Sequence, residues 1–139
     1  MFECKFRPLG IIGAAVLLSI GGIQAASAQA LKSGEQVYKE TCSTCHASGV
    51  AKAPKFGDKA VWKPLIAEGQ HVLTADAWVG VRAMPPKGGR DDLKLEEFAR
   101  ATAFMARAAG GTWKDPDAKM LSLIAAEEKK RRAGLNKAK

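Results

Sequence analysis

The sequence predicts an all-α domain. From Leu95 to Ala108, apolar residues recur at three- and four-residue spacing, which is the periodicity of one helix face. Glycine and proline separate the other helical segments, and the chain has little of the alternating pattern that marks strands. A Cys-x-x-Cys-His motif at residues 42–46 follows the first of these segments, and the other elements can be placed around it.

Cys42, Cys45 and His46 form the pattern that attaches haem c. Each thiol can add across one haem vinyl group to give a thioether, and the adjacent imidazole is then held beneath the iron as an axial ligand. A thioredoxin-like redox pair and half of a zinc site are the alternatives. The first needs a βαβ context, and the second needs two more ligands, for which the chain offers only His71 and Cys4. We therefore expect one covalently attached haem c.

Residues 1–30 have the pattern of a signal peptide. Two basic residues precede an almost unbroken apolar run over residues 9–23, and small residues suited to peptidase cleavage follow. The run is shorter than the roughly twenty residues that a spanning helix needs. We expect cleavage after Ala28 or Ala30 and export to the periplasm, with an uncleaved membrane anchor as the alternative. Export agrees with the cysteine motif, because bacteria attach haem to cysteines outside the cytoplasm.

Size and charge limit the function further. Without residues 1–30 the chain forms one small domain whose polypeptide core would be thin, so a buried haem would add much of the apolar surface. The formal net charge is +8 for the whole chain and +7 after the signal peptide. No nucleic-acid motif accompanies this charge, so nucleic acid is not an expected partner. The charge instead suits docking to acidic protein or membrane surfaces, or simple solubility.

The first helix is expected to begin at Ser33 and to carry both cysteines to the haem at its end. Ser33 and Gln36 fit a capping box, in which the glutamine side chain reaches back. Gly34 lowers helix propensity, which indicates either a close crossing by another helix or a tolerated terminal glycine. The loop at residues 47–57 is the expected source of the carbonyl that holds the ring of His46.

Two shorter helices should follow this loop. Asp58 can cap a helix that Pro64 interrupts and Gly69 closes. A further helix is expected from about residue 72 to residue 79, with Gly80 as its stop.

Met84 is the expected second iron ligand. It lies in the segment Ala83–Gly89, which two prolines keep from being helical, and its thioether is a soft ligand. Met105 falls on the predicted helix at 95–108, where methionine is more often a core residue, and Met120 lies in a polar setting near the C-terminus. A second histidine ligand at His71, or an open position on the iron, are the alternatives.

The helix at 95–108 carries aromatic residues that could close the domain. Phe98 or Phe104 could meet Gly34 and Tyr38 of the first helix and so join the two ends of the domain. Core packing alone would explain these aromatic residues equally well.

These residues together resemble a class I c-type cytochrome, and within that class the cytochrome c5 group of bacterial monohaem proteins. The resemblance covers about seventy residues, from Gly34 to Met105. The matching stretches are Thr41-Cys42-Ser43-Thr44-Cys45-His46-Ala47, Gly49-Val50-Ala51-Lys52-Ala53-Pro54-Lys55, Gly57-Asp58-Lys59-Ala60, Trp62 and Ala83-Met84-Pro85-Pro86-Lys87-Gly88-Gly89.

The resemblance implies a cytochrome c-like helical fold wrapped around one haem, with a defined set of site residues. It implies four residues on the haem: His46 and Met84 as axial ligands, and Cys42 and Cys45 as thioether anchors. It also implies that the Pro54 region supports the histidine and that Trp62 lines the haem near a propionate.

The sequence departs from the group just after the Lys-Gly-Gly turn. Members often carry an extra cysteine pair that begins there, whereas this chain has Arg90-Asp91-Asp92. Lys94 replaces the usual small polar residue before the last predicted helix, so Asp92 is expected to cap that helix instead. Neither departure involves the ligands.

Residues 113–139 form a basic C-terminal extension beyond a cytochrome c domain at residues 31–112. The extension holds eight basic residues against four acidic ones, and Met120, Leu123 and Ile124 share one face if it is helical. It is expected to be a helical or disordered segment, either solvated or acting as a docking arm for an acidic partner or a weak contact with an anionic membrane.

The function that follows is electron transport by a one-electron carrier that is not an enzyme. A histidine and a methionine on the iron leave no position for a substrate. The expected partners are extracytoplasmic redox proteins of a respiratory chain, such as a quinol–cytochrome c reductase and a terminal oxidase or other reductase. Lys52, Lys55 and Lys87 are candidate docking charges. The alternatives are a haem subunit permanently bound in a larger respiratory or dehydrogenase complex and, less favoured, a haem peroxidase or gas-binding protein.

Overall fold

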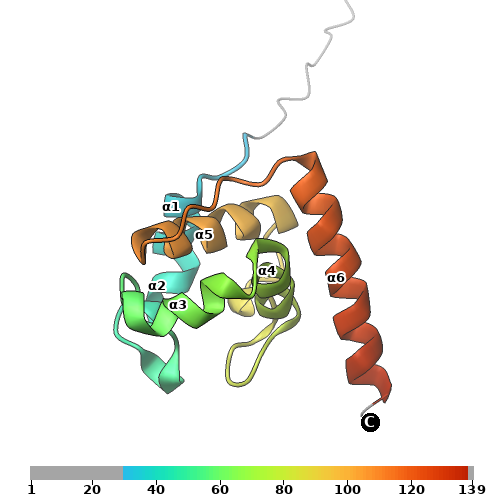
Figure 1. Ribbon diagram of the computed structural model, residues 1–139, viewed down its shortest axis with the longest axis horizontal. Coiled ribbons are helices and arrows are strands. Elements are labelled where there is room, and N and C mark those ends of the chain that lie inside the picture. Colours follow the sequence, from blue (N-terminus) through green and yellow to red (C-terminus); the bar gives the residue numbers. More distant parts are fainter. Residues whose placement is uncertain (1–29, 138–139) are drawn as a thin grey trace, which may run out of the picture.

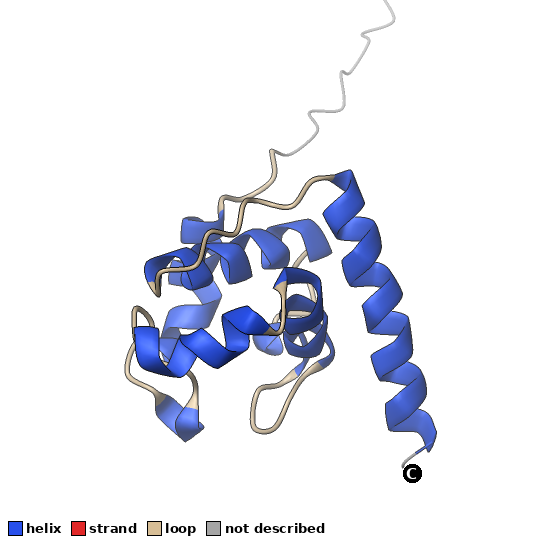
Figure 2. Cartoon of the chain, in the orientation of Figure 1, coloured by secondary structure: helices blue, strands red, loops and turns tan. Residues whose placement is uncertain are grey.

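A computed structural model describes residues 30–137, and within that range every regular element is helical (Figures 1 and 2). The all-α prediction is therefore confirmed. The predicted signal peptide lies outside the described residues, except for Ala30. The elements are α1 (Gly34–Val37), a π-helical turn (Tyr38–Cys42), α2 (Ser43–His46), a 3-10 turn (Val50–Lys52), α3 (Lys59–Ala67), α4 (Gln70–Val79), a second 3-10 turn (Pro86–Gly89), α5 (Leu95–Ala108) and α6 (Ala118–Lys137).

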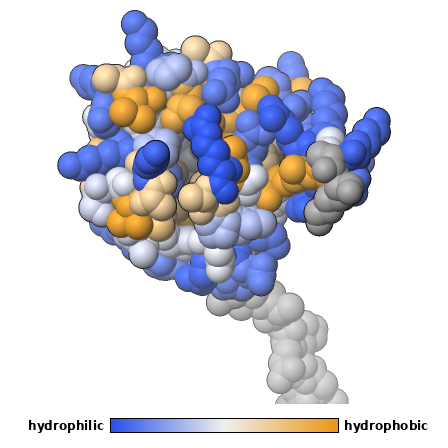
Figure 3. All heavy atoms as spheres, turned by 90° about the horizontal axis from the view of Figure 1, so that it is seen from below, coloured by the Kyte–Doolittle hydropathy of each residue, from blue (hydrophilic) through white to orange (hydrophobic). Residues whose placement is uncertain are grey.

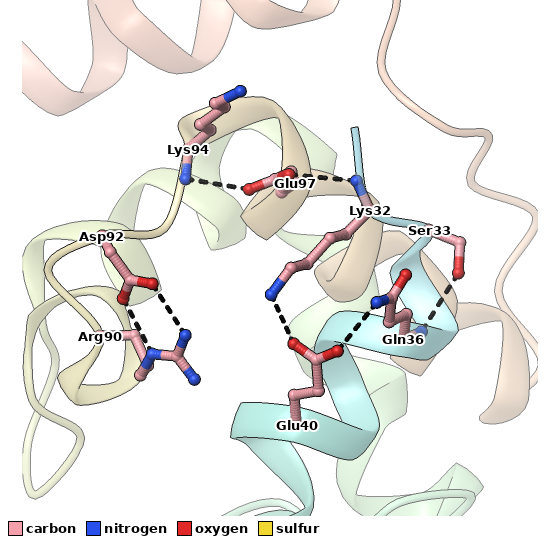
Figure 4. A network of polar contacts seen from close by, with 8 residues as sticks. All are labelled: Lys32, Ser33, Gln36, Glu40, Arg90, Asp92, Lys94 and Glu97. Carbon is pink, nitrogen blue, oxygen red and sulfur yellow. Dashed lines mark hydrogen bonds and ion pairs between the residues drawn. The ribbon is translucent and has the colours of Figure 1, made fainter. Parts of the chain in front are cut away.

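The first helix runs from α1 through the π-helical turn into α2. The Ser43 N–H bonds to the Tyr38 carbonyl, five residues earlier, which marks the wider turn. The Ser33 hydroxyl accepts a hydrogen bond from the Gln36 N–H at 3.2 Å, so the predicted N-cap is confirmed. The reciprocal half of the capping box is wrong, because the Gln36 side chain donates to the charged carboxylate of Glu40, one turn further on, at 2.9 Å (Figure 4).

The crossing of α1 with α5 explains Gly34. A Cβ atom on Gly34 would lie 2.2 Å from the Arg100 carbonyl oxygen and 3.0 Å from the Phe104 Cβ. The Tyr38 ring packs beside the Phe104 ring, with centroids 5.6 Å apart. The close helix crossing, one of the two predicted explanations for this glycine, is confirmed.

A buried carboxylate joins the N-terminal ends of the same two helices. Glu97 is 7% exposed and accepts hydrogen bonds from the backbone N–H groups of Lys32, at 3.0 Å, and Lys94, at 3.3 Å (Figure 4). Glu97 therefore caps the start of α5 by accepting the backbone N–H of the N-cap residue. The predicted cap by Asp92 is wrong, because both oxygens of that carboxylate accept bonds from the Arg90 guanidinium, at 2.8 and 2.9 Å.

The predictions for α3 and α4 were partly confirmed. Asp58 caps α3, accepting bonds from two backbone N–H groups at 3.1 Å. The predicted interruption at Pro64 is wrong, since α3 continues to Ala67. Pro64 removes one backbone hydrogen bond and crowds the preceding turn, but the burial of Trp62 in the main core cluster holds the helix in place. Gly80, with φ of 97°, follows the end of α4 as predicted.

The C-terminal extension is helical and packs on the body. In Figure 1, α6 runs along one side of the molecule next to α4, while α2 and α3 lie on the other side. Ile124 is fully buried against Ala75 of α4 and Ala99 of α5, with Leu121 packed at the edge. The predicted apolar face is wrong in one residue, because Leu123 is 41% exposed and the partly buried Leu121 packs against the cluster in its place. Among the described helices, none combines the length and the hydropathy needed to cross a membrane.

Candidate functional site

The candidate site begins on the last turns of the first helix. Cys45 and His46 lie three and four residues after Cys42, so the helical spacing puts all three side chains on one face. Cys42 and His46 are buried and Cys45 is half-buried. Both cysteines are free thiols. Burial raises the pKa of Cys42 to about 11, so in the bare polypeptide this group is a neutral thiol at pH 7.

The ring of His46 is held by a single backbone carbonyl. Its Nδ1 atom lies 2.9 Å from the carbonyl oxygen of Pro54. Because a carbonyl can only accept, the proton belongs on Nδ1, and the lone pair of Nε2 is left for a metal. The prediction that loop 47–57 supplies this carbonyl is confirmed.

The loop that carries Pro54 is itself fixed by hydrogen bonds at both ends. The Phe56 N–H bonds to the His46 carbonyl at 2.7 Å, and the Trp62 indole N–H bonds to the Lys55 carbonyl at 2.9 Å. The indole of Trp62 therefore ties α3 to the histidine loop. Its predicted place beside a haem propionate stays a prediction.

Phe56 is a structural residue that the sequence analysis missed. Its ring stacks on Tyr38, with centroids 4.4 Å apart, and on Phe104, with centroids 5.5 Å apart. It thereby joins the histidine loop to the crossing of α1 with α5. An aromatic residue in a loop rich in glycine and proline has no periodic partner in the sequence, so no pattern pointed to it.

Met84 lies in a tight turn directly after α4. The Val81 N–H bonds to the Met84 carbonyl at 3.1 Å, and the Met84 N–H bonds to the Val81 carbonyl at 2.9 Å. The Met84 side chain is half-buried and packs against the main core cluster, which also contains Cys42 and Trp62. Gly80 precedes the turn, and a Cβ atom there would lie 2.9 Å from the Pro86 nitrogen.

The alternative ligands occupy other parts of the fold. Met105 is 5% exposed and lies in the core on α5, as its spacing suggested. Met120, on α6, packs at the edge of the cluster formed by Ala75, Ala99 and Ile124. His71 is half-buried in the first turn of α4.

The methionine loop also touches the first helix. A Cβ atom on Gly88 would lie 3.4 Å from the Thr41 Cγ2, so the loop passes beside the residue that precedes Cys42. Lys87 lies over the Trp78 ring, 5.0 Å from its centroid, and donates to the Asp91 carbonyl. The fold therefore brings the loop of the predicted thioether ligand against the helix that carries the thiol pair.

The donor set fits haem c. Two free thiols and an imidazole with an available Nε2 share one helix end, and a thioether lies in a loop that contacts the same helix. An all-α body with this set of donors is the architecture of a c-type cytochrome.

Comparisons with known proteins give the family. Residues 29–105 match the sequence model of the family described as cytochrome C oxidase, cbb3-type, subunit III. The chain is 38% identical to cytochrome c-555 of Chlorobaculum tepidum over 105 residues, which cover 73% of this chain and 94% of that relative. It is also 38% identical to cytochrome c5 of Azotobacter vinelandii over 76 residues, which cover 53% of this chain and 92% of the relative. The chain therefore belongs to the cytochrome c family, as a class I monohaem member that carries covalently attached haem c.

A solved structure agrees with this assignment. One chain from the crystal structure of an electron transfer complex of nitrite reductase with cytochrome c matches with a TM-score of 0.54 and 44% sequence identity. The match covers 58% of the present chain and 99% of the other.

Proposed function

We propose that this protein is an extracytoplasmic one-electron carrier in which Cys42 and Cys45 hold the haem and His46 and Met84 ligate its iron. The hydrogen bond between His46 Nδ1 and the Pro54 carbonyl is the observation that carries the proposal, because it directs Nε2 away from the protein backbone as a metal ligand. When bound, haem c supplies an iron that alternates between the ferric and ferrous states.

The protein residues would keep this site rigid during electron transfer. The Pro54 carbonyl holds the imidazole in one orientation, and the loop around it is fixed by Trp62 and Phe56. The pair of hydrogen bonds between Val81 and Met84 holds the thioether in a tight turn. A ligand set held in this way moves little when the charge changes, which favours fast electron transfer.

The methionine assignment can be tested with three variants of the ferric holoprotein. The weak absorption band in the red reports methionine sulfur on ferric iron. We expect Met84→Leu to lose this band, whereas Met105→Leu and His71→Ala keep it. The two leucine variants are matched in chemistry, and they differ in whether the methionine lies in the turn after α4 or in the core of α5.

Other outcomes would point to other ligands. A band that persists in Met84→Leu would refute this assignment. Loss of low-spin character in His71→Ala would favour a second histidine on the iron. Carbon monoxide binding by the reduced wild-type protein at neutral pH would indicate an open position on the iron. It would favour a gas-binding or peroxidase function over electron transfer.

Lysine side chains near the histidine loop are the proposed docking charges. Lys52 and Lys55 are exposed, whereas Lys87 is half-buried against Trp78, so the first two are the more available to a partner. The similarity to a cytochrome solved with nitrite reductase supports a redox protein as the partner. We expect Lys52→Gln with Lys55→Gln to lower the association rate with an acidic redox partner and its salt dependence. Lys119→Gln with Lys129→Gln on α6 is the matched control, and equal rates for both pairs at low salt would exclude this docking site.

A permanent subunit of a larger redox complex is the second candidate function. It is favoured by the family description, which names a subunit of an oxidase. Native purification distinguishes the two. A free carrier separates from membranes and other proteins in salt, whereas a subunit co-purifies through both detergent and salt.

A further inference from the structure

The C-terminal helix α6 is anchored to the body by a buried contact near its beginning. Ile124 is 0% exposed and packs against Ala75 of α4 and Ala99 of α5, which are also 0% exposed. Met120 and Leu121 pack at the edge of the same cluster. This contact fixes the direction in which the rest of α6 runs along α4.

Two turns further along α6, Arg131 makes an ion pair with α4. Its guanidinium Nη1 lies 2.8 Å from an Asp76 carboxylate oxygen, and its Nε donates to Glu127 at 3.1 Å. The Asp76 side chain is 15% exposed and the Arg131 side chain is 41% exposed, so the ion pair is shielded from water on its acidic side. Burial raises the pKa of Asp76, and the positive charge of Arg131 offsets part of that rise.

Asp76 begins the last turn of α4, which leads into the Met84 turn. Its carbonyl accepts the final helical hydrogen bond from the Gly80 N–H at 3.0 Å. Val81 follows at once and is bonded twice to Met84. Gly80 has no space for a side chain against Pro86, so a movement of this turn is transmitted directly to the methionine loop.

The ion pair lies in the wall of a groove between the last turns of α6 and the segment after α4. The groove has a volume of about 380 Å³, and its lining includes Asp76, Arg131, Val81, Arg82, Gly134 and Leu135. Leu135 is 53% exposed. Figure 3 shows apolar side chains on this underside beside the end of α6. Among the described residues, Arg131 makes the last ion pair from α6 to the end of α4.

We propose that Arg131, through its ion pair with Asp76, is a positioning residue that holds the end of α4 and so keeps the Met84 thioether on the iron. In this role α6 stabilises the position of the turn that carries Met84. The inference rests on the proposed methionine ligation, and it adds a function for the extension outside the part that matches the family model, residues 29–105.

The test is imidazole binding to the ferric, full-length holoprotein, because imidazole must displace the methionine. The titration is monitored by the decrease of the weak red absorption band of the ferric protein. We expect Arg131→Gln to raise the apparent imidazole affinity about fivefold to tenfold, in line with the loss of a partly buried ion pair. Arg131→Lys should restore most of the wild-type affinity. Arg132→Gln is the matched control and should leave it unchanged, because Arg132 pairs only with Glu128 on its own helix among the described residues.

Asp76→Asn provides an independent second variant. It should raise the affinity as Arg131→Gln does, and the double variant should add little, because both changes break one pair. Imidazole affinities within twofold of wild type in both single variants would overturn the proposal, even if denaturant melts show that both are less stable. A red band that survives in Met84→Leu would instead mean that the ligand assignment itself is wrong.

Discussion

Replacing Gly34 by alanine gives the sharpest test of the helix crossing. Helix propensity alone favours alanine over glycine by up to about 1 kcal/mol, so the local effect is stabilising. The tertiary effect has the opposite sign. The added Cβ would lie 2.2 Å from the Arg100 carbonyl oxygen and 2.7 Å from its carbonyl carbon, and both are backbone atoms of α5 that no rotamer change can move.

The size of the effect follows from the movement that is needed. An ordinary contact starts at about 3.4 Å, so α1 and α5 would have to separate by about 1 Å at this point. That separation would loosen the stacked rings of Tyr38, Phe56 and Phe104. Overpacking a well-packed interior costs typically about 1–3 kcal/mol, and occasionally more when backbone must shift. With the upper end of that cost and the opposing gain in helix propensity, we expect Gly34→Ala to lower the free energy of unfolding by about 2 kcal/mol.

The assay is guanidinium unfolding of the ferric holoprotein, followed by far-ultraviolet circular dichroism. Gly134→Ala is the matched control, because Gly134 lies inside α6 and its Cβ would meet nothing within 4 Å. The control should be unchanged or more stable by up to about 1 kcal/mol. If Gly34→Ala proved as stable as wild type, the close approach of the two helices would be wrong.

Three further predictions concern other parts of the fold. Ile124→Ala should cost about 2–5 kcal/mol in a denaturant melt, because a fully buried side chain between α4, α5 and α6 is lost; a cost below 1 kcal/mol would mean that α6 is not docked. Glu97→Ala should cost about 1–3 kcal/mol by the same measurement, since the backbone N–H groups of Lys32 and Lys94 lose their acceptor. The Asp92 carboxyl should titrate with a pKa of about 2 in an NMR pH series, and Arg90→Gln should return it toward 3.8. Because folding lowers this pKa, the pair stabilises the protein above pH 3.8, and this contribution is lost as the pH falls toward 2. The midpoint of acid unfolding should therefore lie at a higher pH in Arg90→Gln than in the wild type.

The local signals in the sequence located most helices and all the candidate ligands. Caps at Ser33 and Asp58 and the periodic face of α5 act within a few residues, so they can be recognised without knowing the fold. The Cys-x-x-Cys-His motif is local for the same reason, because helical spacing alone brings its three side chains to one face.

What the sequence left open involves contacts between distant segments. The sequence alone allowed Gly34 to be either a crossing point or a tolerated residue, and only the Arg100 carbonyl on α5 decided between them. Pro64 was expected to break a helix that packing keeps whole. The carboxylate of Asp92 was expected to cap a helix but pairs with Arg90. No local sequence pattern predicts the ion pair between Arg131 and Asp76. Such contacts depend on shape and burial, which arise only when the helices pack together.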